Sequence, residues 1–103
     1  MYDQGDFIQR AIGLGYHEIV VMAHREATEA ERGTSKVKGS VRKRNAGALE
    51  YAAFLKGVIF FLQSGTKPLG LSDQQFMSIR PLAVDLVKRG IFDQKILDAF
   101  QQK

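Results

Sequence analysis

The chain has 103 residues, of which 45% are hydrophobic and 25% charged, as expected for one ordinary globular domain that spans residues 1–103. It contains no cysteine, which excludes disulfides, thiolate metal sites and a cysteine nucleophile. The first six residues are polar and acidic and do not resemble a signal peptide, so a cytoplasmic location is the expectation.

The net charge of +4 is unevenly distributed along the chain. Residues 32–44 contain no acid and six basic residues: Arg32, Lys36, Lys38, Arg42, Lys43 and Arg44. The rest of the chain holds nine basic and eleven acidic residues, a net charge of −2. The basic character of the chain is therefore confined to this segment.

The N-terminal third predicts two helices separated by Gly13-Leu14-Gly15. Asp6 is placed to cap a short first helix, and apolar residues at helical spacing continue from Tyr16. The apolar stripe of this second helix has smaller side chains toward its C-terminal end. It consists of Tyr16, Ile19, Val20, Ala23, Ala27 and Ala30. A strand over residues 18–22 is the alternative interpretation.

The segment from Gly33 to Asn45 breaks the helical pattern. It has two glycines, three Ser or Thr residues and five basic residues, with only Val37 and Val41 to bury. Such a composition cannot offset the entropy cost of ordering the chain, so we expect a flexible, exposed basic loop.

The stretch from Ala46 to Ser64 is the most apolar in the chain and predicts a central helix. Gly65 is placed to end it in the left-handed conformation, and Pro68 prevents its continuation. A buried strand over residues 58–62 is the competing interpretation. The charges of Glu50 and Lys56 argue against a membrane span.

The C-terminal third predicts two further helical segments. Ser72 and Gln75 fit a capping box, and the helix that follows either kinks at Pro81 or restarts with Ser78 as its cap. After Gly90, Asp93 caps a last helix. The expected fold is therefore all-α: a small single-domain bundle of four to five helices around the central apolar helix.

Most candidate catalytic and ligand sites in the sequence are weak. His17 and His24 lie about 10.5 Å apart along a helix, too far for one metal ion, and we interpret Glu26, Glu29 and Glu31 as a solvated helix face. The segments 33–36 and 65–67 lack the complete phosphate-loop pattern. A helix-turn-helix over residues 76–100 would have an acidic reading helix. We therefore expect no enzyme, no cofactor, no metal and no small-molecule substrate.

The basic loop is the stronger candidate site. Its basic residues could neutralise several phosphates or contact an acidic protein partner, and they are Lys36, Lys38, Arg42, Lys43 and Arg44. The loop has no aromatic residue for base stacking, so any binding to nucleic acid would tolerate different sequences.

The positions of two further residues, Leu49 and Phe60, indicate a contact between subunits. Leu49 and Phe60 lie opposite the main apolar face of the central helix, so a second layer should cover them, either the Ala23–Ala30 stripe or another copy of the chain. Our interpretation is a non-enzymatic helical interaction module that forms a homo-oligomer. The alternative is a nucleic-acid-associated protein that binds phosphates non-specifically through residues 36–44.

Overall fold

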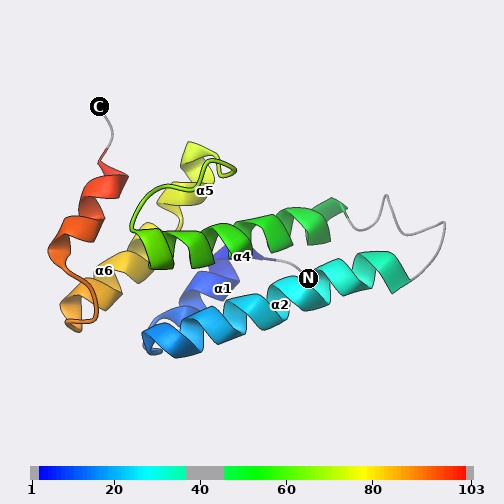
Figure 1. Cartoon of the computed structure of the whole chain (residues 1–103), viewed down its shortest axis with the longest axis horizontal. Helices are drawn as coiled ribbons and strands as arrows, with labels where there is room; N and C mark the ends of the chain where they lie inside the picture. The colour runs from blue at the N-terminus through cyan, green and yellow to red at the C-terminus, as the bar shows by residue number, and fades with distance from the viewer. Residues whose placement is uncertain (1–2, 37–45, 102–103) are drawn as a thin grey trace.

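Two long antiparallel helices, α2 (Tyr16–Lys36) and α4 (Ala46–Ser64), lie side by side along the length of the structure (Figure 1). The computed structural model describes residues 3–36 and 46–101. Over these residues the protein is a compact, mostly helical domain with five α-helices, a 3₁₀ helix and no strand. The remaining helices are α1 (Gln4–Ala11), α5 (Asp73–Met77), α6 (Arg80–Lys88) and the 3₁₀ helix η1 (Gln94–Phe100).

The predicted all-α class is confirmed, and both strand alternatives are wrong. Residues 18–22 lie inside α2 and residues 58–62 lie inside α4, because in each case the apolar run belongs to a longer helical register. None of the helices in the described part of the chain combines the length and the apolar character needed to cross a membrane.

The helix α4 supplies more of the core than any other element. It contributes nine of the 23 buried apolar residues found in the described ranges: Ala48, Tyr51, Ala52, Phe54, Leu55, Val58, Ile59, Phe61 and Leu62. The alanine stripe of α2 packs against it, with Ala23, Ala27 and Ala30 all buried. Small side chains at these positions let the two helix backbones approach closely.

An aromatic cluster joins the C-terminal segments to α4. Phe76 and Phe100 stack with their ring centroids 4.4 Å apart, and Phe61 meets both rings edge-on at 5.4 and 5.1 Å. Edge-on and offset rings are favourable aromatic geometries, so this contact fixes η1 although it has only seven residues.

The predicted helix ends were correct at several positions. Ser72 and Gln75 form the expected capping box, with hydrogen bonds of 3.1 and 3.0 Å. Gly65 and Gly90 end α4 and α6 with φ of +75° and +78°. Asp93 caps the last segment by accepting from the Lys95 amide, although this segment is a 3₁₀ rather than an α-helix.

Two predicted caps were wrong. The N-cap of α1 is Asp3, whose side chain accepts from the Asp6 amide at 3.2 Å, so this helix begins earlier than expected. The chain does restart before Pro81, but Ser78 ends α5 instead of capping α6, because its hydroxyl donates to the Gln75 carbonyl at 2.6 Å.

The predicted boundary of the basic loop was also wrong. Helix α2 continues through Gly33 to Lys36, since the packing of Ala27 and Ala30 on α4 supports its last turns. The rest of the predicted loop, residues 37–45, lies outside the described residues.

Candidate docking surface

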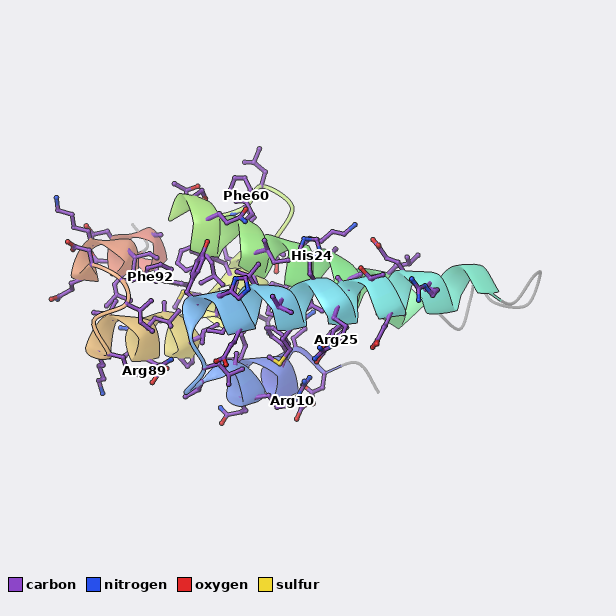
Figure 2. All side chains as sticks on the ribbon, turned by 60° about the horizontal axis from the view of Figure 1, so that its bottom comes forward. Arg10, His24, Arg25, Phe60, Arg89 and Phe92 are labelled. Atoms are coloured by element: carbon purple, nitrogen blue, oxygen red, sulfur yellow. The ribbon has the colours of Figure 1, made fainter. Side chains whose placement is uncertain are left out.

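One face of α4 points away from the bundle. Its residues follow one another at intervals of four, three and four positions, which places them within an arc of about 60°. We call them the outer stripe of α4: Leu49, Ala53, Lys56 and Phe60. All four are exposed, and the two large apolar members keep 52% (Leu49) and 49% (Phe60) of their surface accessible. Figure 2 shows Phe60 projecting from the outside of the helix.

A groove runs beside the outer stripe. It encloses about 320 Å³ and its lining is almost entirely apolar, consisting of Ala53, Lys56, Gly57, Phe60, Pro68, Leu69, Gly70 and Leu71. The side chain of Leu69 is fully exposed at this groove, at 103% of its reference surface. Leu69 and Phe60 therefore expose apolar surface along the same groove, and grouped apolar surface of this kind marks interaction sites more often than single residues do.

The floor of the groove depends on Gly57. The loop between α4 and α5 crosses the helix here, and the side chain of Leu71 is buried against the Gly57 backbone. A Cβ atom at position 57 would lie only 2.8 Å from Leu71 Cδ1. The glycine therefore brings the loop, with Leu69, close to the outer stripe.

The opposite edge of the outer stripe borders α2. Lys56 forms an ion pair with Glu31 across the two helices. Both side chains are substantially exposed, so the pair contributes at most about 1 kcal/mol to stability. The ion pair directs the ammonium group of Lys56, the one charged residue on the outer stripe, toward the edge of the stripe next to α2.

The structure excludes one of the two layers considered for Leu49 and Phe60. The Ala23–Ala30 stripe packs on a different side of α4 and leaves both residues half exposed. It therefore does not cover them, and within the described residues these side chains are open to a partner.

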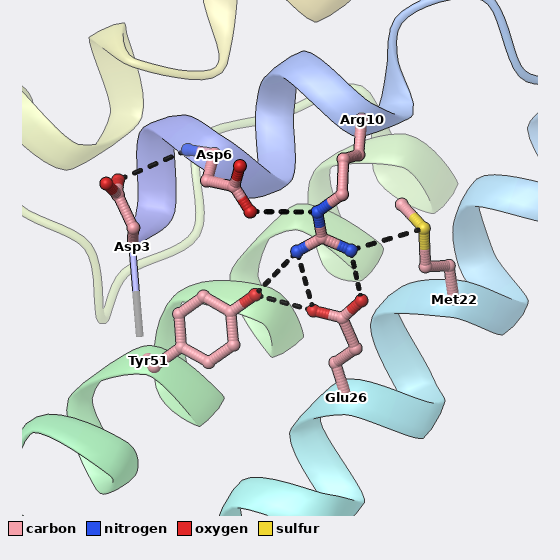
Figure 3. A network of polar contacts seen from close by, with 6 residues as sticks. All are labelled: Asp3, Asp6, Arg10, Met22, Glu26 and Tyr51. Carbon is pink, nitrogen blue, oxygen red and sulfur yellow. Dashed lines mark hydrogen bonds and ion pairs between the residues drawn. The ribbon is translucent and has the colours of Figure 1, made fainter. Parts of the chain in front are cut away.

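A polar network on the other side of α4 joins three helices (Figure 3). The Arg10 guanidinium of α1 donates to both carboxylate oxygens of Glu26 on α2, at 2.5 and 3.1 Å. It also donates to Asp6 at 2.9 Å, and the Tyr51 hydroxyl of α4 donates to Glu26 at 2.6 Å. A bidentate arginine–carboxylate pair of this kind fixes geometry as well as adding stability.

Contacts within the network shift the pKa values of its members, and each shift favours the protonation state that the hydrogen bonds require. The hydrogen bond from Arg10 holds the pKa of Glu26 below its ordinary value, and burial raises the pKa of the Tyr51 hydroxyl. The same hydrogen bond to Glu26 raises the pKa of Arg10. All three residues keep their usual charge states near neutral pH, so we interpret the network as a clamp between helices and not as an acid–base site.

This clamp was not predicted from the sequence. Glu26 was predicted to be a solvated surface residue, which is wrong because Arg10 and Tyr51 occupy both of its oxygens. Glu29 is exposed, and Glu31 stays substantially exposed in its surface ion pair with Lys56, so both match the prediction of a solvated face. The one signal in the sequence was that Glu26 lies beside the buried stripe of α2, seven residues after Ile19.

The structure does not bring the other candidate residues of the sequence together into a site. His17 and His24 are both exposed on α2, and no group of three potential metal ligands occurs among the described residues. Residues 33–36 are helical, and residues 65–67 form the turn after α4, so neither forms a phosphate loop. Of the basic contact residues, Lys36 ends α2, and Lys38, Arg42, Lys43 and Arg44 lie outside the described residues.

In comparisons with known proteins, no family model, no curated protein and no solved structure matches this chain.

Proposed function

We propose that this protein is a non-enzymatic helical interaction module that forms a homo-oligomer through the outer stripe of α4. The observation that supports it most is the grouping of apolar side chains. Among the described residues six large hydrophobic side chains are exposed: Val21, Leu49, Phe60, Leu69, Met77 and Ile91. Three of these, Leu49, Phe60 and Leu69, belong to the outer stripe or its groove.

The grouping of these side chains on one surface supports a contact site more strongly than their individual exposure does. A single exposed apolar residue is ordinary on a protein surface, but a continuous patch beside a preformed groove is typical of a contact site. Burial of such a patch by a second copy provides the hydrophobic driving force for association. The cytoplasmic location expected from the sequence is part of this proposal.

The direct test compares two charge substitutions at matched positions. Phe60→Glu places a charge in the proposed interface, whereas Val21→Glu alters an apolar side chain of similar exposure (44%) on the outer face of α2. We expect the wild type to be larger than a monomer by light scattering, Phe60→Glu to be a folded monomer, and Val21→Glu to keep the wild-type mass. A wild type that stays monomeric at millimolar concentration contradicts the proposal.

A second candidate function is supported by the charge distribution alone. Residues 36–44 carry Lys36, Lys38, Arg42, Lys43 and Arg44 with no acid, and such a segment attracts phosphates. Binding of DNA, RNA or an acidic protein through this segment is compatible with an oligomer, since it requires none of the residues of the outer stripe.

A further inference from the structure

The residues of the outer stripe are arranged symmetrically along α4. Leu49 and Phe60 lie equally far, on opposite sides, from the midpoint of the helix segment 49–60, and so do Ala53 and Lys56. A large apolar residue therefore lies at each end and a smaller or flexible one on each side of the centre. An interface between two identical chains around a two-fold axis needs a surface that is complementary to itself in this way.

From this spacing we propose that two copies of the chain pair their α4 helices antiparallel, with the two-fold axis between the two helices at the level of residues 54–55. This inference rests on the proposed function and specifies its geometry. Leu49 then packs against Phe60 of the partner subunit. Ala53 lies opposite Lys56 of the partner subunit, and its small side chain leaves room for the lysine stem.

Charge also favours the antiparallel arrangement over a parallel one. Parallel helices in register would place Lys56, the one charged residue of the outer stripe, directly opposite the same residue of the partner. Like charges that face each other directly in an interface cost free energy. In the antiparallel pair Lys56 faces Ala53 of the partner subunit instead, and its own copy is offset by three residues, about 4.5 Å along the axis.

The helix dipoles act in the same direction. Each α4 has a partial positive charge at its N-terminus and a partial negative charge at its C-terminus. In the antiparallel pair the opposite ends meet, whereas parallel helices place equal ends together.

The groove adds contact area beside the helix pair. A specific interface buries about 800 Å² on each partner, which is more than four side chains on one helix supply. Leu69 projects at the edge of the outer stripe and is available to extend the contact beyond α4. The inferred interface therefore comprises the outer stripe and the Leu69 loop.

Disulfide trapping tests the arrangement cleanly, because the chain has no cysteine of its own. Leu49→Cys and Phe60→Cys are made separately, one with a mass tag, and each is checked for a wild-type circular dichroism spectrum. In the antiparallel pair two copies of position 49 are about 16 Å apart along the axis, as are two copies of position 60. A disulfide requires Cα atoms within about 7 Å, so neither variant should crosslink to itself.

The mixture of the two variants should form the mixed disulfide as its dominant product under mild oxidation. An equimolar mixture of Ala53→Cys and Lys56→Cys tests the second pair of the same register and should also form a mixed disulfide. Two copies of either position are only about 4.5 Å apart along the axis, so self-crosslinking at these two positions does not count against the arrangement. Efficient self-crosslinking of Leu49→Cys and of Phe60→Cys, without a mixed product, would mean parallel helices and would overturn the inference.

Light scattering on the same samples separates this inference from the function on which it rests. A dimer that yields no disulfide at any of the four positions keeps the oligomer but rejects this interface. A wild type that is monomeric rejects both.

Discussion

Leu71 lies directly over Gly57, so close that a Cβ atom on residue 57 would meet Leu71 Cδ1 at 2.8 Å and Cγ at 2.9 Å. The contact joins the most apolar helix to the loop that carries the exposed Leu69. The loop can therefore pack this close to α4 because position 57 has no side chain.

The first prediction concerns this contact. Gly57→Ala should displace Leu71 and lower the free energy of unfolding, because overpacking costs about 1–3 kcal/mol and exceeds the gain of up to about 1 kcal/mol in helix propensity. Gly47→Ala is the matched control, since it lies in the same helix with nothing within 4 Å of its added Cβ, and it should not destabilise. Urea unfolding measures both variants.

A double-mutant cycle identifies the cause. If Gly57→Ala acts through Leu71, then Leu71→Ala should cost clearly less in the Gly57→Ala background than in the wild type. Equal costs in the two backgrounds would show that the clash is relieved without moving Leu71.

The second prediction separates two leucines that are two residues apart. Leu69 is fully exposed and Leu71 is only 5% exposed. Leu69→Ser should change monomer stability by no more than about 0.5 kcal/mol, yet weaken self-association measured by analytical ultracentrifugation. Leu71→Ser should instead destabilise the fold by about 2 kcal/mol or more, because it removes buried apolar groups. A normal association constant for Leu69→Ser would exclude this loop from the interface.

The third prediction concerns the pH dependence of stability through Glu26. The folded state lowers the pKa of Glu26 through the hydrogen bond from Arg10, so the carboxylate stabilises the fold above about pH 5. This contribution should be lost as the pH falls through the ordinary glutamate range near 4.3 toward the lower folded value. Glu26→Gln should therefore be less stable than the wild type by about 1–2 kcal/mol at pH 7, with a shrinking difference in acid.

The control for this experiment is Glu29→Gln, because Glu29 is exposed on the same helix. Its stability should stay within about 0.5 kcal/mol of the wild type. Thermal unfolding between pH 7 and pH 3 provides the comparison. A constant gap between Glu26→Gln and the wild type over this range would show that the carboxylate charge is not the stabilising feature.

The fourth prediction tests nucleic-acid binding. Replacing Arg42, Lys43 and Arg44 by glutamine should weaken binding to generic duplex DNA and reduce the slope of log K against log salt, by about 0.9 for each phosphate that the protein no longer neutralises. The matched variant replaces three exposed basic residues elsewhere, Arg80, Lys88 and Lys95, and should retain most of the affinity. Fluorescence anisotropy at about 50 mM salt measures the series, and equal decreases in affinity for the two variants would indicate only general charge attraction.

The sequence by itself determined the helical class and most helix ends. The bounds of α4 follow from its apolar register and from Gly65, and the capping box at Ser72 was predicted residue by residue. These features depend on contacts between neighbours in sequence, such as a hydroxyl and an amide three residues away. They can be predicted because the interacting groups have a fixed spacing in the chain.

The tertiary structure alone decided how the helices use their surfaces. The clamp joins residues separated by 16, 25 and 41 positions, Arg10 with Glu26, Glu26 with Tyr51 and Arg10 with Tyr51, and no periodicity encodes such distances. Similarly, the pattern of α4 showed that Leu49 and Phe60 lie apart from its main face, but only the packing of α2 and of the Leu71 loop showed that nothing described covers them. Whether a side chain is buried depends on which distant segment packs against it, and that is decided when the helices pack together.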